Sequence, residues 1–156
     1  ILYNILKQNL NLKISFKQRC SINTKNIEID FIIYDNNQHI LYIIELKSGC
    51  TFDTGKVDSI NINLLQIINF YKPNYTNIKC QLCCFYTNSI NEIIKGTKNK
   101  ILPYIECITG KELCQQFSIN FDTIIQLSKQ DGQQNINYIS EKFKQLSLQL
   151  EPYIKK

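Results

Sequence analysis

Three charged residues interrupt an otherwise apolar stretch of the sequence between residues 27 and 49. Asp30 lies in the run IEIDFIIY, and Glu45 and Lys47 lie in the later run ILYIIELKSG. Carboxylates and an amine placed this close in a chain can hold a divalent cation and assist the attack of water on a phosphate. The types and the spacing of these residues make them the first candidates for a reactive site.

Both apolar runs predict β-strands that a polar turn joins into an antiparallel hairpin. Side chains alternate between the two faces of a strand, so Glu45 and Lys47 should share a face, as should Glu28 and Asp30. The other face of the first strand would then carry Ile27, Ile29, Phe31 and Ile33. If the turn spans residues 36–39, Asp30 lies across from Glu45, and Glu28 lies across from Lys47. Opposed residues have Cβ atoms about 4.5–5.5 Å apart, so two carboxylates would meet.

Opposed carboxylates repel each other, and burying an unpaired one costs on the order of several kcal/mol. A divalent cation offsets this cost, because Mg²⁺ is commonly held by one or two carboxylates and by substrate phosphate oxygens. We therefore expect Asp30 and Glu45 to hold Mg²⁺, with the backbone carbonyl of Leu46 as a further ligand. Lys47 would act on the attacking water or on the phosphate charge. The alternative is a solvated sheet face with a cross-strand ion pair, which suits poorly the apolar neighbours Ile32, Leu41 and Ile43.

This arrangement resembles the PD-(D/E)XK nuclease superfamily, whose fold is called restriction-endonuclease-like. In that family an Asp at the end of a strand is followed by a turn and a strand ending in Glu-x-Lys, a pattern carried here by Asp30 and by Glu45-Leu46-Lys47. The resemblance implies Mg²⁺ or Mn²⁺ as cofactor, DNA as substrate, and a homodimer or larger assembly. It also implies an auxiliary role for Gln66, because QIINFY resembles the Gln-x-x-x-aromatic feature of RecB-like branches.

Two positions depart from the family pattern. Ile29 stands where the family name has Pro, and no acidic residue precedes Glu28, whereas an upstream helix supplies one in many members. Either Glu28 takes the place of that acid as an auxiliary residue, or the acid lies upstream of this sequence. Because the sequence begins at Ile1 and contains no methionine, we expect the chain to be trimmed at its N-terminus.

The remaining sequence predicts the scaffold that would position these residues. Helical spacing of apolar residues predicts helices over residues 2–12 and 57–71, the second ending before Pro73. Short apolar runs predict a strand of about 4–8 residues within residues 78–88 and another strand over residues 101–109, and a short helix begins near Thr109. The tail predicts two helical segments broken at residues 131–132. This order indicates an α/β fold with a mixed central β-sheet flanked by helices, in a single domain over residues 1–156.

Composition narrows the partners and the compartment. The 156 residues carry a formal net charge of +5, a mildly basic balance that favours polyanions such as nucleic acid. No apolar stretch approaches the roughly 18 residues of a membrane span. The seven cysteines, an odd number, lie mostly inside apolar runs instead of forming a disulfide framework. We therefore expect an intracellular protein of a reducing compartment, whether the cytoplasm, the nucleus or the interior of an organelle.

Other chemical groups have simpler interpretations. The CxxC spacing within residues 80–84 lacks a suitable second pair of ligands, so buried cysteines are favoured over a zinc site. His39 is interpreted as a surface turn residue. Asp53 or Thr54 is interpreted as a helix cap, with contact of Asp53 and Lys56 to phosphate as the alternative. The lysines of residues 95–100 form a solvated loop with the charge to contact a nucleic-acid backbone.

Taken together, these residues predict a metal-dependent endonuclease that hydrolyses DNA phosphodiester bonds, similar to type II restriction enzymes or to RecB-like nucleases. One alternative is a catalytically inactive nuclease-like fold that serves as a binding or assembly module in a larger complex. Another is a nucleic-acid-binding domain without enzymatic activity. The complete Asp30, Glu45 and Lys47 set favours the enzyme, and the missing upstream acid favours the inactive module.

Overall fold

The computed structural model describes residues 1–22 and 24–154, and the side chains of this part except those of residues 143 and 145–154. The chain divides into two compact units. Leu2–Ile119 form one unit, which contains the β-sheet and every candidate site residue, and Ile1 with the chain from Asn120 onward forms the other. The expectation of a single domain over residues 1–156 remains a prediction.

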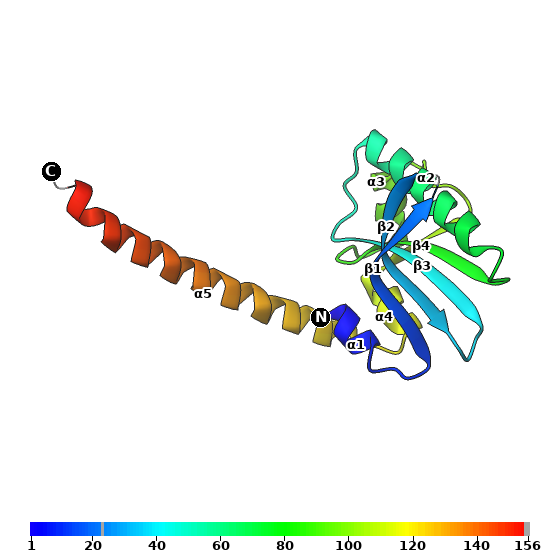
Figure 1. Cartoon of the computed structure of the whole chain (residues 1–156), viewed down its shortest axis with the longest axis horizontal. Coiled ribbons are helices and arrows are strands. Elements are labelled where there is room, and N and C mark those ends of the chain that lie inside the picture. The colour runs from blue at the N-terminus through cyan, green and yellow to red at the C-terminus, as the bar shows by residue number, and fades with distance from the viewer. Residues whose placement is uncertain (23, 155–156) are drawn as a thin grey trace. The chain divides into compact units, whose positions relative to one another are not determined.

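A mixed five-stranded sheet forms the centre of the Leu2–Ile119 unit (Figure 1). Its strands lie side by side in chain order: β1 Leu12–Ile22, β2 Lys25–Asp35, β3 Ile40–Lys47, β4 Ile78–Cys84 and β5 Ile105–Thr109. Strand β2 is antiparallel to β1 and β3, whereas β4 is parallel to β3 and β5. The helices of this unit are α1 Leu2–Leu6, α2 Thr54–Tyr71, α3 Ile90–Gly96 and α4 Gly110–Gln116. The predicted α/β fold with a mixed sheet and flanking helices is confirmed.

The two kinds of strand pairing follow from the connections. The β2–β3 turn is tight: Asp35 Oδ1 accepts hydrogen bonds from the N–H groups of Asn37 and Gln38 at 2.8 and 3.1 Å. The last ladder pair before this turn is Asp35 with Ile40, so the predicted turn is correct. The predicted register is correct as far as the pair of Phe31 with Ile44, where the ladder ends before the predicted pairs of Asp30 with Glu45 and of Glu28 with Lys47. Parallel strands need a longer crossover, which α2 supplies between β3 and β4.

Helix α2 covers one face of the sheet. Asp53 caps its first turn by accepting a hydrogen bond from Lys56 N at 2.7 Å, as predicted. Its buried residues Val57, Ile60, Leu64 and Ile67 pack in one core cluster with strand residues Ile29, Ile43 and Leu82. On the other face, the ring of Tyr42 meets Phe117, the C-cap of α4, with centroids 5.2 Å apart. The central strands are therefore buried on both sides.

The N-terminal region differs from the prediction. The expected helix over residues 2–12 ends at Leu6, and Leu12 begins strand β1, which the sequence interpretation missed. Polar residues alternate irregularly with apolar ones in LKISFKQRCSI, and most of this edge strand is at least partly exposed. A half-exposed edge strand lacks the continuous apolar signal that identified β2 and β3.

Two further differences concern helices. Residues 90–96 form α3, which was not predicted, and residues 101–104 precede β5 as a loop instead of belonging to it. The C-terminal unit contains α5 Phe121–Ile154, which runs without a break through residues 131–132. The expected break was wrong because one glycine costs a helix only about 1 kcal/mol relative to alanine. None of the described helices is both long and apolar enough to cross a membrane.

Candidate active site

The candidate site lies where β2 and β3 separate. Their ladder ends at the pair of Phe31 with Ile44. From there β2 pairs with β1 as far as Ile22 and Lys25, while β3 pairs with β4 as far as Lys47 and Cys84. Two strands that stop pairing with each other leave room for polar side chains between them. We call this place the β2–β3 fork, and its residues are Asp30 on β2 and Glu45, Leu46 and Lys47 on β3.

Asp30 bridges the fork through its carboxylate. Its Oδ2 accepts a hydrogen bond from the backbone N–H of Leu46 at 2.8 Å, which connects the two strands just beyond their last ladder pair. Its Oδ1 forms an ion pair with Nζ of Lys17 on β1. The residue is only 8% exposed. A buried carboxylate normally has such partners, because an unpaired charge away from water is strongly unfavourable.

The backbone is irregular next to Asp30. The β1–β2 ladder pairs Phe16 with Phe31 and Gln18 with Ile29, and Lys17 between them has a φ of 52°. Left-handed φ angles are uncommon for residues other than glycine. Ile29 and Ile32 both belong to the core cluster under α2, although strict alternation would place them on opposite faces. The predicted common face of Ile27, Ile29, Phe31 and Ile33 is therefore wrong, since Phe31 instead packs against Phe16.

Glu45 and Lys47 point to the same side of β3 and form an ion pair with each other. Their side chains are 18% and 24% exposed. Burial raises the pKa of Glu45; Lys47 opposes this shift through a hydrogen bond and its charge, and the charge of Asp30 raises the Glu45 pKa further. The two carboxylates are therefore close enough for the charge of Asp30 to disfavour ionisation of Glu45.

Glu28 does not lie across from Lys47, contrary to the prediction. Glu28 pairs with Arg19 on β1, and Oε2 of Glu28 is 3.2 Å from Nε of Arg19. Its Oε1 is 3.6 Å from Nζ of Lys17. The prediction failed because it extended the β2–β3 register past Phe31, where the β2–β3 ladder ends while β2 remains paired with β1.

Lys17 is the residue of this site that sequence reasoning missed. Its ammonium contacts both Asp30 and Glu28, and hydrogen bonding to Asp30, opposed by partial burial, raises the pKa of Lys17. The signal that could have found it is the register of the β1–β2 hairpin, in which paired residue numbers sum to 47. Recognising residues 12–22 as a strand would have placed position 17 beside position 30.

Two predicted site groups have no described contact that assigns them a role. Gln66 is half-buried on α2, and the described side chains show no hydrogen bond from it to Asp30, Glu45 or Lys47. Leu46 contributes its N–H to Asp30, whereas its carbonyl was the group predicted to hold a metal. Both roles remain predictions.

The fork supplies some, but not all, of the oxygen ligands that a hard divalent cation needs. Asp30 and Glu45 supply two carboxylates, which is the number that Mg²⁺ commonly takes from a protein, with water and phosphate oxygens completing its shell. Among the residues that the structure describes, no group of three or more His, Cys, Asp or Glu side chains is placed to hold a metal. A cation at this site would therefore need oxygen atoms from water and substrate as well.

A shallow pocket of about 210 Å³ adjoins Lys47. It lies between the end of β3 and the start of α2, and its lining residues are Lys47, Ser48, Gly49, Thr51, Phe52 and Lys56. Close by, Nζ of Lys98 donates a hydrogen bond to Thr54 Oγ1 at 3.0 Å, which brings the turn after α3 against the first turn of α2. Lys56 therefore shares this pocket with Lys47, and Lys98 lies beside the first turn of α2.

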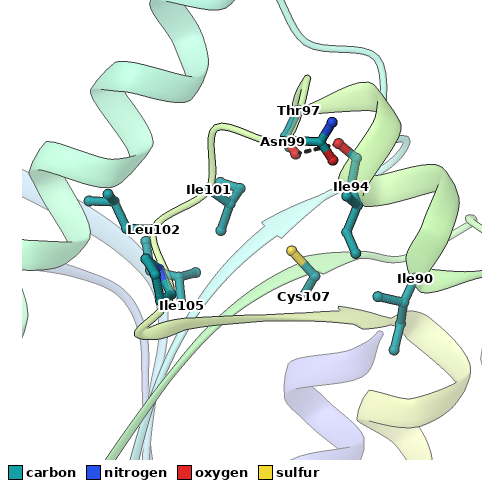
Figure 2. A pocket seen from close by; sticks show the side chains of 9 residues that line it. Ile90, Ile94, Thr97, Asn99, Ile101, Leu102, Ile105 and Cys107 are labelled. Carbon is teal, nitrogen blue, oxygen red and sulfur yellow. Dashed lines mark hydrogen bonds between the residues drawn. The ribbon is translucent and has the colours of Figure 1, made fainter.

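A second, more apolar pocket of about 290 Å³ lies between α3, the loop before β5 and β5 itself (Figure 2). Its lining residues are Ile90, Ile94, Thr97, Asn99, Ile101, Leu102, Pro103, Ile105 and Cys107. Burial raises the pKa of the Cys107 thiol, and the Thr97 hydroxyl donates to the Ile94 carbonyl at 3.0 Å. The lining contains neither carboxylate nor imidazole, so this pocket lacks the groups for hydrolytic chemistry.

The cysteines and the histidine have the simple roles that were expected. Cys80, Cys83 and Cys84 are buried on β4, and burial raises the pKa of Cys80 and of Cys84 to about 12. Thiols with such a high pKa are poor nucleophiles near neutral pH. His39 lies in the β2–β3 turn, where its Nδ1 is 3.2 Å from the Tyr34 hydroxyl.

Comparison with known proteins finds one distant similarity. The chain is 26% identical over 133 residues to the type II restriction enzyme HhaII of Haemophilus parahaemolyticus. This alignment covers 83% of the chain and 59% of that enzyme, so the chain matches less than two thirds of the relative's length. No protein-family model matches the sequence.

Proposed function

We propose that this chain carries the catalytic core of a metal-dependent endonuclease that hydrolyses DNA phosphodiester bonds. The observation that carries the proposal is that the Asp30 carboxylate binds the backbone of β3 at Leu46, between Glu45 and Lys47, whose side chains are paired with each other. The distant similarity to a type II restriction enzyme supports it independently of the geometry. A type II restriction-like and a RecB-like enzyme both remain compatible with this site.

In the proposed site Asp30 and Glu45 hold Mg²⁺ or Mn²⁺, and the Leu46 carbonyl is a candidate third ligand. A bound divalent ion supplies Lewis acidity toward a phosphate oxygen and makes a bound water more acidic. Leu46 N–H and Asp30 fix the distance between the strands through their 2.8 Å hydrogen bond. Partial burial of Glu45 and Lys47 keeps bulk water away, which strengthens electrostatic interactions within the site.

Lys47 has the second role in this proposal. Its ammonium is paired with Glu45, and the residue lines the pocket at the start of α2. From this position it can stabilise negative charge on a phosphate as the phosphodiester is attacked, and it can orient the attacking water. Lys56, on the same pocket, and Lys98, beside Thr54, would contact neighbouring phosphates of the DNA backbone.

A cleavage assay tests the proposal. Supercoiled plasmid and single-stranded DNA are incubated with the protein and Mg²⁺ or Mn²⁺, with a chelator as the metal-free control. We expect cleavage by the wild type and a loss of about a hundredfold or more for Lys47→Met, the usual cost of removing a group that stabilises transition-state charge. Lys13→Met, an exposed substitution on β1 with the same change in charge, should cleave like the wild type. A wild type inert on every substrate with either ion contradicts the enzymatic proposal.

An inactive nuclease-like module is the second candidate, and one observation favours it. Lys17 already neutralises Asp30, and the described residues provide no third acidic ligand. Calorimetric titration with Mg²⁺ separates the candidates, with Asp30→Ala as control. A folded wild type that binds no Mg²⁺ and cleaves no DNA would favour the module.

A further inference from the structure

Both carboxylate oxygens of Asp30 already have partners within the protein. Oδ2 accepts the Leu46 N–H at 2.8 Å, and Oδ1 is paired with the Lys17 ammonium. The Leu46 bond comes from the backbone and is held in place by the β3–β4 ladder around it. Lys17, in contrast, reaches Asp30 through a long side chain that is 50% exposed. Of the two partners, the ammonium is the one that can leave without moving a strand.

A second carboxylate, that of Glu28, lies close enough to pair with the Lys17 ammonium. Glu28 lies two residues before Asp30 on β2, and its Oε1 is 3.6 Å from Lys17 Nζ. The Glu28 side chain is 41% exposed, so a closer pairing there requires little desolvation. Movement from Asp30 to Glu28 needs only rotations within the Lys17 side chain, because the same nitrogen already lies within 4 Å of both groups.

The backbone at Lys17 supports a specific role for this side chain. Its φ of 52° is costly for a residue with a Cβ, and such conformations persist where the surrounding structure imposes them. The ladder pairs on either side, Phe16 with Phe31 and Gln18 with Ile29, hold this conformation in place. Position 17 thus lies directly beside Asp30 and Glu28.

We propose that Lys17 is an internal counter-ion that competes with a divalent cation for Asp30 and moves to Glu28 when the cation binds. The inference rests on the proposed function, in which Asp30 holds the metal. In the metal-free protein Lys17 neutralises Asp30 and so limits repulsion between Asp30 and Glu45. On metal binding the cation takes over that neutralisation, and Glu28 accepts the displaced ammonium. Lys17 and Glu28 therefore set the metal affinity of the site as positioning residues without being ligands.

Isothermal titration of the full chain with Mg²⁺ tests this competition. Lys17→Met removes the competing charge and keeps an unbranched side chain, so we expect Mg²⁺ to bind about tenfold more tightly, which corresponds to about 1.4 kcal/mol. Glu28→Gln removes the receiving carboxylate, so Mg²⁺ should bind several-fold more weakly. Lys13→Met is the matched control, since position 13 lies about 13 Å away at the rise of an extended strand and its charge should be screened.

The outcomes separate this inference from the proposed function. If the wild type binds Mg²⁺, Asp30→Asn abolishes binding and Lys17→Met binds no more tightly, the competition is refuted while the metal site stands. If neither the wild type nor any variant binds Mg²⁺, the metal site is refuted and the competition with it. A purely structural role for Lys17 would lower thermal stability equally with and without Mg²⁺, whereas competition predicts a larger Mg²⁺-induced rise in melting temperature for the variant. Should Lys17→Met fail to fold, Lys17→Gln provides the same two measurements.

Discussion

Replacing Lys47 with Met should destabilise the metal-free protein by an amount that depends on how exposed the ion pair of Lys47 with Glu45 is. The change removes the ammonium paired with Glu45 and keeps most of the apolar stem. Exposed ion pairs contribute about 0.2–1 kcal/mol, whereas breaking a buried pair costs about 3–5 kcal/mol. Because the side chains of Lys47 and Glu45 are 24% and 18% exposed, the free-energy cost of breaking their ion pair should lie between these two values. We expect the free energy of unfolding to fall by about 2 kcal/mol near neutral pH.

The same substitution should have a characteristic pH dependence. Burial raises the pKa of Glu45, and Lys47 partly opposes that shift, so its removal should raise the Glu45 pKa further. A carboxyl group with a higher pKa in the folded state binds its proton more tightly when folded, so stability falls as pH rises through the folded pKa. The loss caused by Lys47→Met should therefore be largest near neutral pH and shrink as the pH is lowered and Glu45 takes up a proton.

Urea unfolding followed by circular dichroism, in the presence of a chelator, measures this effect at about pH 7.5 and about pH 5. Glu45→Gln and the double variant complete a double-mutant cycle. We expect the double variant to recover most of the stability lost in Lys47→Met, because a neutral Gln needs no counter-ion. Equal losses at both pH values, or a double variant no more stable than Lys47→Met, would refute the reasoning.

Two further stability predictions use matched variants and the same unfolding measurement. Asp30→Ala leaves the Leu46 N–H without its described acceptor and should lower the free energy of unfolding by about 1–3 kcal/mol. Asp30→Asn keeps a side-chain oxygen, so its loss of stability should be about 1 kcal/mol smaller. Equal losses in the two variants would contradict the importance of this hydrogen bond. Gly96→Ala would place a Cβ 1.7 Å from the Cys50 carbonyl oxygen and should cost about 3 kcal/mol or more. Gly132→Ala meets no described atom within 4 Å and should stabilise α5 by about 0.5–1 kcal/mol, so a destabilised Gly132→Ala would contradict the continuous helix.

The central hairpin was predictable because its signals are local. Continuous apolar runs identified β2 and β3, and the polar turn set their register as far as Phe31 and Ile44. Alternation along β3 alone placed Glu45 and Lys47 on one side. The α2 cap at Asp53 followed from residue type and position in the same way.

The structural errors of the sequence interpretation arose where a local pattern was weak or was extended too far. Strand β1 is half-exposed and rich in polar residues, so its apolar periodicity is poor. The break expected at residues 131–132 gave too much weight to one glycine in a long helix. Glu28 was assigned to Lys47 because the hairpin register was continued beyond the point at which the strands separate.

The sequence by itself indicated the candidate residues Asp30, Glu45 and Lys47 and, through the two-residue period of β3, placed Glu45 and Lys47 on one side. Only the tertiary structure decided how the strands diverge at the β2–β3 fork and which charges meet there. Lys17 is adjacent to Asp30 because β1 pairs with β2 along its whole length, including the part beyond the end of the β2–β3 ladder. Such a contact depends on the path of a third strand, which the alternation of residues within the hairpin does not encode.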